Sequence, residues 1–210
     1  MRSEVIAFAG VAALLTISPG ADMALVGRRA LGPGPLRDAC LAALGISAGV
    51  IAWAALSAIG VAAILAASAT AYTALKVAGG IYLVLLGLLA FRDARRTLRD
   101  GVAEEALAAE SRSAWAAFRE GLVTNLLNPK IAVFYTAVLP QFVAPGDPVL
   151  PVSLLLAGIH ATLGIAWLCG YAWVLHRSRA VLGARARAAM QVVTGVVLLG
   201  LGGRVALDRG

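Results

Sequence analysis

The stretch "LLTISPGADMALV", residues 14–26, interrupts an apolar run that is long enough to cross a membrane. Proline has no backbone N–H and disrupts the helix that contains it, and here Gly20 follows Pro19 directly. Asp22 adds a carboxylate where a central charge costs about 2.5–3.5 kcal/mol on membrane-insertion scales. We therefore expect a membrane helix that is broken at Pro19 and Gly20, with Asp22 facing a partner or a cavity.

The chain as a whole has the composition of a polytopic membrane protein. Of its 210 residues, 60% are hydrophobic and 14% are charged, whereas a typical soluble domain carries about 25% charged residues. In lipid only helices and closed barrels satisfy the backbone, and these apolar runs are too long and continuous for barrel strands. The sequence predicts an all-α membrane protein with six transmembrane helices, at about 5–27, 39–67, 71–91, 114–142, 149–175 and 186–207.

The connections between these runs differ in charge. Residues 68–70 and 144–148 contain no basic residue, whereas twelve arginines occupy the other connections. The positive-inside rule places the arginine-rich connections in the cytoplasm and both termini outside. We assign the net charge of +7 to membrane orientation and predict no nucleic acid as a partner. The twelve residues are Arg28, Arg29, Arg37, Arg92, Arg95, Arg96, Arg99, Arg112, Arg177, Arg179, Arg185 and Arg187.

The second half of the chain carries a counterpart of the first break. Ser18-Pro19 aligns with Asn128-Pro129 at an offset of 110 residues, and both pairs interrupt the first span of their half. Because each half has an odd number of spans, the second half inserts upside down. Such inverted repeats are typical of secondary transporters, although membrane helices also tolerate prolines as packing kinks. We expect one domain, 1–210, with repeats at about 4–91 and 114–207 and a cytoplasmic linker at about 92–113.

Two residues of opposite charge lie beside these prolines. Asp22 and Lys130 are inside the first span of their half, where a charge normally faces a cavity or a partner. Three roles fit this placement: an ion pair that fastens the broken helices, two charges that flank a zwitterionic solute, or a proton carried by Asp22. A zwitterion would direct its carboxylate toward Lys130 and half-helix N-termini, and its ammonium toward Asp22.

Further polar residues near the breaks are candidates for substrate binding or coupling. Asn125 and Asn128 are three residues apart, so a helix places them on one face. Asn128 and Ser18 each precede a proline and can instead cap a half-helix. His160, inside the fifth span, either serves the pathway or a proton, or only packs. The full candidate set is Thr16, Ser18, Asp22, Asn125, Asn128, Lys130, Gln141 and His160, with Pro19, Gly20 and Pro129 as helix-breaking residues.

The cysteines and the glycine pattern favour packing over chemistry. Cys40 and Cys169 have neither CxxC nor Cys/His spacing, so we interpret them as small core side chains and predict no metal or cofactor. Gly45 and Gly49 form a GxxxG pattern, which is typical of close helix packing. This packing is either internal or between the subunits of a homo-oligomer.

The motifs around both prolines resemble a known family. "SPGADMALVGRRAL" (18–31), "GGIYLVLLGLLAFR" (79–92) and "GLVTNLLNPKIAVFYTAVLPQFV" (121–143) are similar to the LysE/RhtB family of bacterial amino-acid exporters. The resemblance covers nearly the whole chain and implies a six-helix inner-membrane exporter, driven by ion or substrate gradients. The family often has PGP where this chain has Pro19-Gly20-Ala21. Residue by residue, the resemblance extends to Pro19, Gly20, Asn128, Pro129 and Lys130.

We therefore predict a secondary transporter that exports an amino acid or a related small metabolite by alternating access. ATP as the energy source within this chain is disfavoured, because neither Lys76 nor Lys130 has a Walker A setting. An exporter of metal cations is the first alternative, although the spans offer few oxygen or sulfur ligands. A membrane-embedded enzyme would need a nucleophile–base constellation, which we do not find. A non-transporting assembly subunit would leave the paired breaks unexplained.

Overall fold

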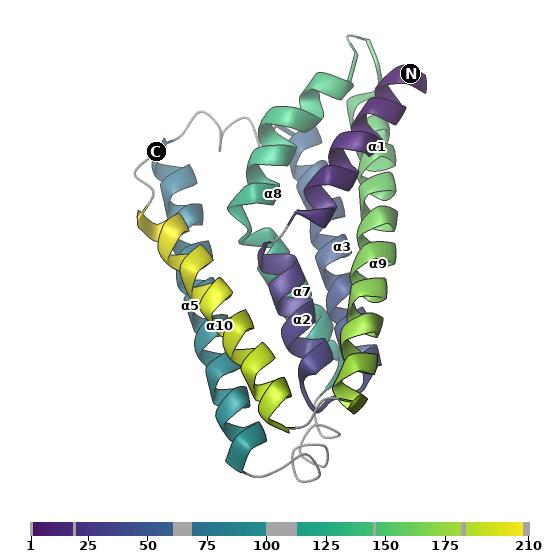
Figure 1. The fold of residues 1–210 in the computed structure, drawn as a ribbon. Helices are drawn as coiled ribbons and strands as arrows, with labels where there is room; N and C mark the ends of the chain where they lie inside the picture. The colour runs from purple at the N-terminus through teal and green to yellow at the C-terminus, as the bar shows by residue number, and fades with distance from the viewer. Residues whose placement is uncertain are drawn as a thin grey trace.

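A computed structural model describes residues 2–18, 20–60, 69–99, 113–144, 146–181 and 184–207 (Figure 1). Within these ranges every regular element is helical and no strand occurs, which confirms the all-α prediction. The first half contains α1 (Arg2–Ile17), α2 (Ala21–Leu31), α3 (Leu36–Ala58) and α5 (Ala69–Arg99). The second half contains α7 (Ala114–Leu126), α8 (Pro129–Val133), the π-helix η1 (Phe134–Val138), the 3₁₀-helix η2 (Leu139–Phe142), α9 (Val149–Val181) and α10 (Ala184–Leu207).

Both predicted breaks coincide with sharp bends. Helices α1 and α2 meet at 51°, and the segment Pro129–Phe142 bends by 55° away from α7. Pro19 itself lies outside the described residues. Gly20 precedes α2 in an extended conformation, and Asn128 precedes α8 in the same way. The chain therefore leaves the helical path for only a few residues in each half.

Two unbroken helices are long and apolar enough to cross a membrane in the described part of the chain. They are α3, with 23 residues, and the segment Val149–Ser178 of α9, with 30 residues. Counting each bent pair as one span raises the number to four. In α10 the described apolar segment is shorter, Gln191–Gly200. The six-span arrangement stays a prediction.

Close backbone contact fixes the position of α7 against α3. A Cβ atom on Gly45 would overlap the carbonyl oxygen of Phe118, and one on Gly121 would overlap that of Ala42. Gly49 lies against the side chain of Asn125 in the same interface. Because glycines permit this approach, the GxxxG pattern of α3 packs inside the chain.

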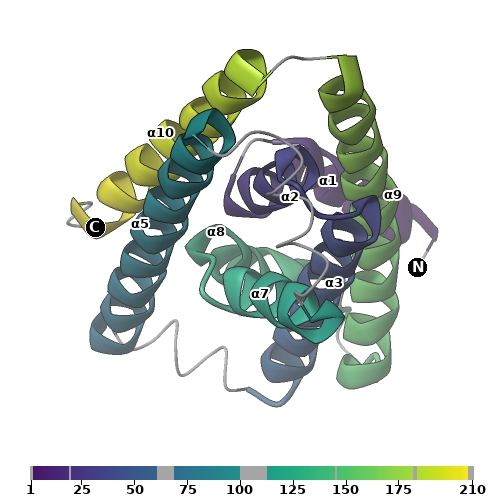
Figure 2. The same cartoon turned by 90° about the horizontal axis from the view of Figure 1, so that it is seen from below.

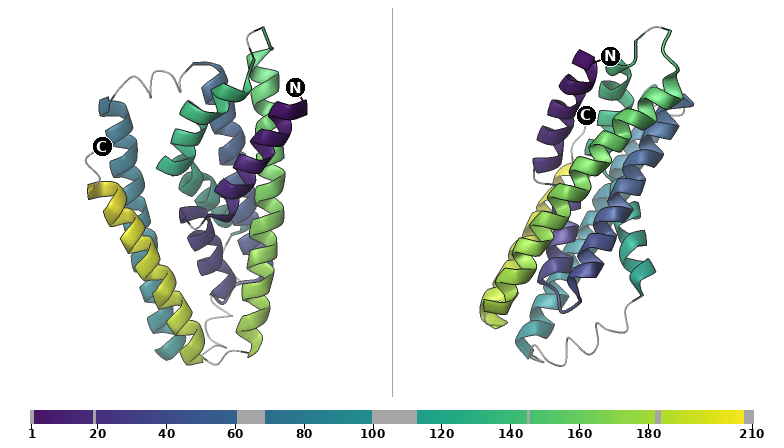
Figure 3. Two further views of the ribbon diagram at one scale, coloured as in Figure 1. Left: turned by 45° about the horizontal axis from the view of Figure 1, so that its top comes forward. Right: turned by 90° about the vertical axis from the view of Figure 1, so that its right-hand side faces the viewer.

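The remaining helices are arranged around this pair. Helix α9 packs along α3 (Figure 3) and also contacts α1 and α2, whereas α5 and α10 pack together at one side (Figure 2). Phe8 of α1 is fully buried against the rings of Phe134 and Phe142, at centroid distances of 5.7 and 5.3 Å. The start of α1 and the end of α10 lie at the same end of the molecule (Figure 1). A chain with both termini on one membrane face requires this arrangement.

Candidate functional site

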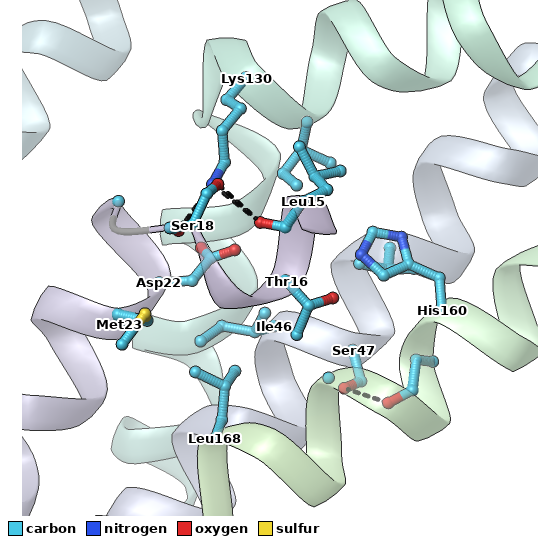
Figure 4. A pocket seen from close by; sticks show the side chains of 15 residues that line it. Leu15, Thr16, Ser18, Asp22, Met23, Ile46, Ser47, Lys130, His160 and Leu168 are labelled. Atoms are coloured by element: carbon cyan, nitrogen blue, oxygen red, sulfur yellow. Dashed lines mark hydrogen bonds between the residues drawn. The ribbon is translucent and has the colours of Figure 1, made fainter. Parts of the chain in front are cut away.

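A cavity lies between the two helix breaks, and we call it the break cavity (Figure 4). The centre of a water-sized sphere can occupy about 30 Å³ of it, and one buried water needs about 10–15 Å³ by that measure. The cavity therefore has room for about two or three waters in this conformation and is too small for an amino acid. Of the predicted site residues, it is lined by Thr16, Ser18, Gly20, Asp22, Lys130 and His160.

Lys130 reaches across from α8 to the end of α1. Its ammonium donates to the carbonyl oxygens of Leu15 and Ser18, both at 3.2 Å, and to the Ser18 hydroxyl at 3.0 Å. In an unbroken helix the Leu15 carbonyl would accept from the N–H of residue 19, but residue 19 is a proline and has no N–H. The lysine of one half therefore binds a carbonyl that a proline leaves free in the other half.

Asp22 is held by amide groups of α7 and the second break. Its carboxylate accepts from Asn125 Nδ2 at 3.2 Å and from Asn128 Nδ2 at 3.4 Å. It also lies in the first turn of α2, where the helix dipole favours a negative charge. Among the described residues no direct ion pair joins Asp22 to Lys130. The two charges face one cavity with separate partners.

The second break frees a carbonyl in the equivalent position. Asn125 precedes Pro129 by four residues, just as Leu15 precedes Pro19. Here the freed carbonyl of Asn125 accepts from the Trp53 indole at 3.4 Å and from the backbone N–H of Asn128 at 3.0 Å. Asn128 also caps α8, since its side-chain oxygen accepts from the Lys130 N–H at 3.1 Å. The second break is thus closed by residues of the protein itself.

Two further predicted residues lie in different surroundings. His160 is buried at the side of the break cavity, and its Nδ1 is 3.0 Å from the Tyr135 hydroxyl with the two rings stacked. Gln141 is exposed and donates to the carbonyl of Ala137, and it does not line the cavity. Among the described residues, no group of three or more His, Cys, Asp or Glu side chains is placed to hold a metal ion.

Residues 13–209 match the family described as LysE type translocator. The chain belongs to this family. The translocator is 26% identical to "Uncharacterized membrane protein YrhP" of Bacillus subtilis, over 98% of this chain and 99% of that protein. It is 33% identical to the threonine efflux protein of Escherichia coli K12, over 63% of this chain and 62% of the relative. No solved structure matches the chain.

A third comparison concerns another efflux protein. The translocator is 29% identical to the homoserine/homoserine lactone efflux protein of Salmonella typhi, over 78% of this chain and 76% of that protein. Together with the apolar helices, the family membership makes this chain a multi-pass membrane protein. It also confirms the resemblance that the proline motifs indicate.

The translocator has a buried group of charges that the sequence did not single out. Arg28 pairs with Asp93 at 3.2 Å and with Glu120, and Arg29 Nε donates to Glu120 at 2.7 Å. We call these four residues the α2–α5–α7 ion cluster. The span predicted at about 5–27 leaves Arg28 and Arg29 in a connection, yet both residues lie within α2, at six and seven residues from Asp22. The local sequence signal that the helix continues through both arginines is Gly32-Pro33, because glycine and proline commonly follow the last turn of a helix.

Proposed function

We propose that this translocator is a secondary transporter that exports a small amino acid or a related metabolite across the bacterial inner membrane. The observation that carries the proposal is the break cavity, where an aspartate and a lysine from different halves face each other without forming an ion pair. Family membership and the threonine and homoserine efflux relatives support an exported small metabolite. An embedded charge in a membrane protein is most often functional.

A zwitterion fits the chemistry of this cavity. Asp22 offers a negative charge, Lys130 a positive one, and the first helix break presents the carbonyl oxygens of Leu15 and Ser18. The lining also combines polar side chains, among them Thr16, Ser47 and His160, with apolar side chains that suit a short aliphatic group. The apolar residues include Met23, Ile46, Val50, Ile131 and Leu168.

We propose transport by alternating access, which the small size of the cavity supports. A solute that is larger than a few waters enters only when helices on one side move apart. We propose that the chain is one domain of two inverted repeats, at about 4–91 and 114–207, joined by a linker at about 92–113 that lies outside the described residues from 100 to 112. The helix contacts support this symmetry. The second span of the first half, α3, packs against the broken span of the second half at α7, and the second span of the second half, α9, packs against the broken span of the first half, α1 and α2.

We place the arginine-bearing ends of α2 and α5 in the cytoplasm and both termini outside, by the positive-inside rule. In that orientation the α2–α5–α7 ion cluster lies between the break cavity and the cytoplasm. It joins helices of both halves through Arg28, Arg29, Asp93 and Glu120. We interpret it as the contact that closes the cavity toward the cytoplasm in this conformation.

An efflux panel tests the proposal. Cells with and without the protein are loaded with dipeptides, and the amino acids that appear in the medium are measured over time. We expect at least one amino acid to appear faster when the protein is present. If no amino acid does so and the protein instead changes tolerance to a metal, the metal-exporter alternative replaces this proposal.

A further inference from the structure

The end of α1 is built as a receptor for an ammonium group. Leu15 and Ser18 present two carbonyl oxygens and one hydroxyl to a single nitrogen, at 3.0–3.2 Å. A primary ammonium has three N–H donors, so three acceptors satisfy it completely. The negative end of the α1 dipole adds to the attraction for a cation. In this structure the ammonium belongs to Lys130 of the other half.

We propose that these acceptors form a subsite for the primary ammonium group of a ligand, and that Lys130 fills the subsite when no ligand is bound. The inference rests on the proposed function for its meaning in transport, and it deepens that function by assigning the ammonium to α1 rather than to Asp22. Replacing one ammonium by another leaves the charge of the subsite unchanged. The released Lys130 is then free to meet the carboxylate of the same ligand inside the break cavity.

Two features allow the Lys130 ammonium to leave the subsite. It sits on a flexible four-carbon chain, and its acceptors are uncharged groups rather than the Asp22 carboxylate. The absence of a side chain at Gly20 leaves room for the Lys130 ammonium, because a Cβ atom there would lie 3.2 Å from the Lys130 Nζ. Lys130, Leu15 and Ser18 all line the break cavity, so a ligand in it reaches the subsite directly (Figure 4).

The first test uses the purified full chain with Lys130→Met, which empties the subsite. Methylammonium chloride is the probe, and tetramethylammonium chloride, which has no N–H donor, is the matched salt. We expect methylammonium to raise the Tm of K130M saturably by a few degrees, with no rise in tetramethylammonium. Wild type and the control Arg119→Met, which removes an exposed positive charge from α7, should need at least tenfold more methylammonium. Equal responses of K130M to both salts would overturn the subsite.

Ser18 provides a check on the location. Adding Ser18→Ala to K130M removes one of the three acceptors, and we expect the methylammonium affinity to fall about tenfold, as for the loss of one hydrogen bond to a charged group. An unchanged affinity would place the bound methylammonium elsewhere and contradict the proposal.

The second test uses the wild-type chain and does not depend on the folding of K130M. The sequence contains only two lysines, Lys76 and Lys130, so ¹⁵N-lysine labelling gives two ammonium signals in an NMR spectrum. We expect methylammonium to shift the Lys130 signal saturably, while tetramethylammonium and the Lys76 signal serve as references. A Lys130 signal that does not respond would overturn the proposal.

These outcomes separate the subsite from the proposed function. Amino-acid export without any effect of methylammonium on Lys130 removes the subsite and leaves the exporter. Methylammonium binding at Lys130 without export of any amino acid keeps the subsite and removes the exporter.

Discussion

At the scale of single residues, the Asp22 carboxylate accepts hydrogen bonds from two asparagine side chains. One donor is Asn125 in the last turn of α7, and the other is Asn128, which caps α8 at the second break. In Asp22→Asn the side chain keeps its shape but has one acceptor oxygen for two amide donors, and no charge. We expect the export rate to fall at least tenfold while the amount of protein in the membrane stays near the wild-type level. Efflux assays and quantitative immunoblots measure the two quantities.

Lys130→Ala is expected to abolish export as well, for a different reason. It removes the ammonium that donates to the carbonyl oxygens of Leu15 and Ser18, although the Ser18 hydroxyl still donates to the Leu15 carbonyl. It also removes the one lysine or arginine among the described residues that line the break cavity. Glu4→Gln, a charge loss at an exposed position, is the control and should export normally. Normal export by both Asp22→Asn and Lys130→Ala would contradict the assignment of the site to this cavity.

At the scale of elements, the contact between α3 and α7 leaves no space for a side chain at Gly45. In Gly45→Ala the new Cβ atom would overlap the carbonyl oxygen of Phe118, so the helices must separate. We expect a loss of about 1–3 kcal/mol in stability, typical of overpacking, measured as a lower unfolding temperature in detergent. Gly158→Ala in α9 is the matched control, since nothing lies within 4 Å of its Cβ position. Equal unfolding temperatures would contradict the close packing.

The α2–α5–α7 ion cluster joins three elements through Glu120. In Glu120→Gln, Arg28 and Arg29 lose their shared carboxylate in a buried setting. Removing one partner of a buried ion pair costs about 3–5 kcal/mol, so we expect a lower unfolding temperature. Arg37→Gln is the control, because the Arg37 side chain is 68% exposed and lies 3.9 Å from Asp38. If both variants unfold at the same temperature, the cluster does not hold these helices together.

At the scale of the whole molecule, the sequence predicts features that have a local chemical cause or a counterpart in the other half of the chain. The helix breaks and the placement of Asp22 and Lys130 on one cavity are of this kind. The bend before Pro129 follows from a proline in an apolar run. The pairing of Arg28 with Asp93 joins positions 65 residues apart and has no local signal. The sequence predicts a span at about 114–142 and offers Gln141 within it as a polar candidate, yet Gln141 does not line the break cavity. The chain changes to a π-helix and then a 3₁₀-helix from Phe134 to Phe142, so the helical period no longer holds there.

The orientation of the molecule is the prediction on which its direction of transport depends. Helix α5 has 31 residues and a length of about 46 Å at 1.5 Å per residue, which matches a bilayer with its headgroups at about 40–45 Å. Its two ends should therefore lie on opposite membrane faces. With Cys40 and Cys169 replaced by alanine, Thr70→Cys should react with an impermeant thiol reagent in intact cells. Arg95→Cys should react only after permeabilisation.

Each labelling position controls for the other, because both are exposed residues of one helix. The reverse pattern would place the arginines outside and overturn the orientation, together with the cytoplasmic position of the ion cluster. Reaction of both positions in intact cells would mean that α5 does not span the membrane. The first half would then have an even number of spans, and the second half would no longer be inverted. The proposed symmetry, in which Asp22 and Lys130 occupy corresponding positions of the two halves, would be wrong.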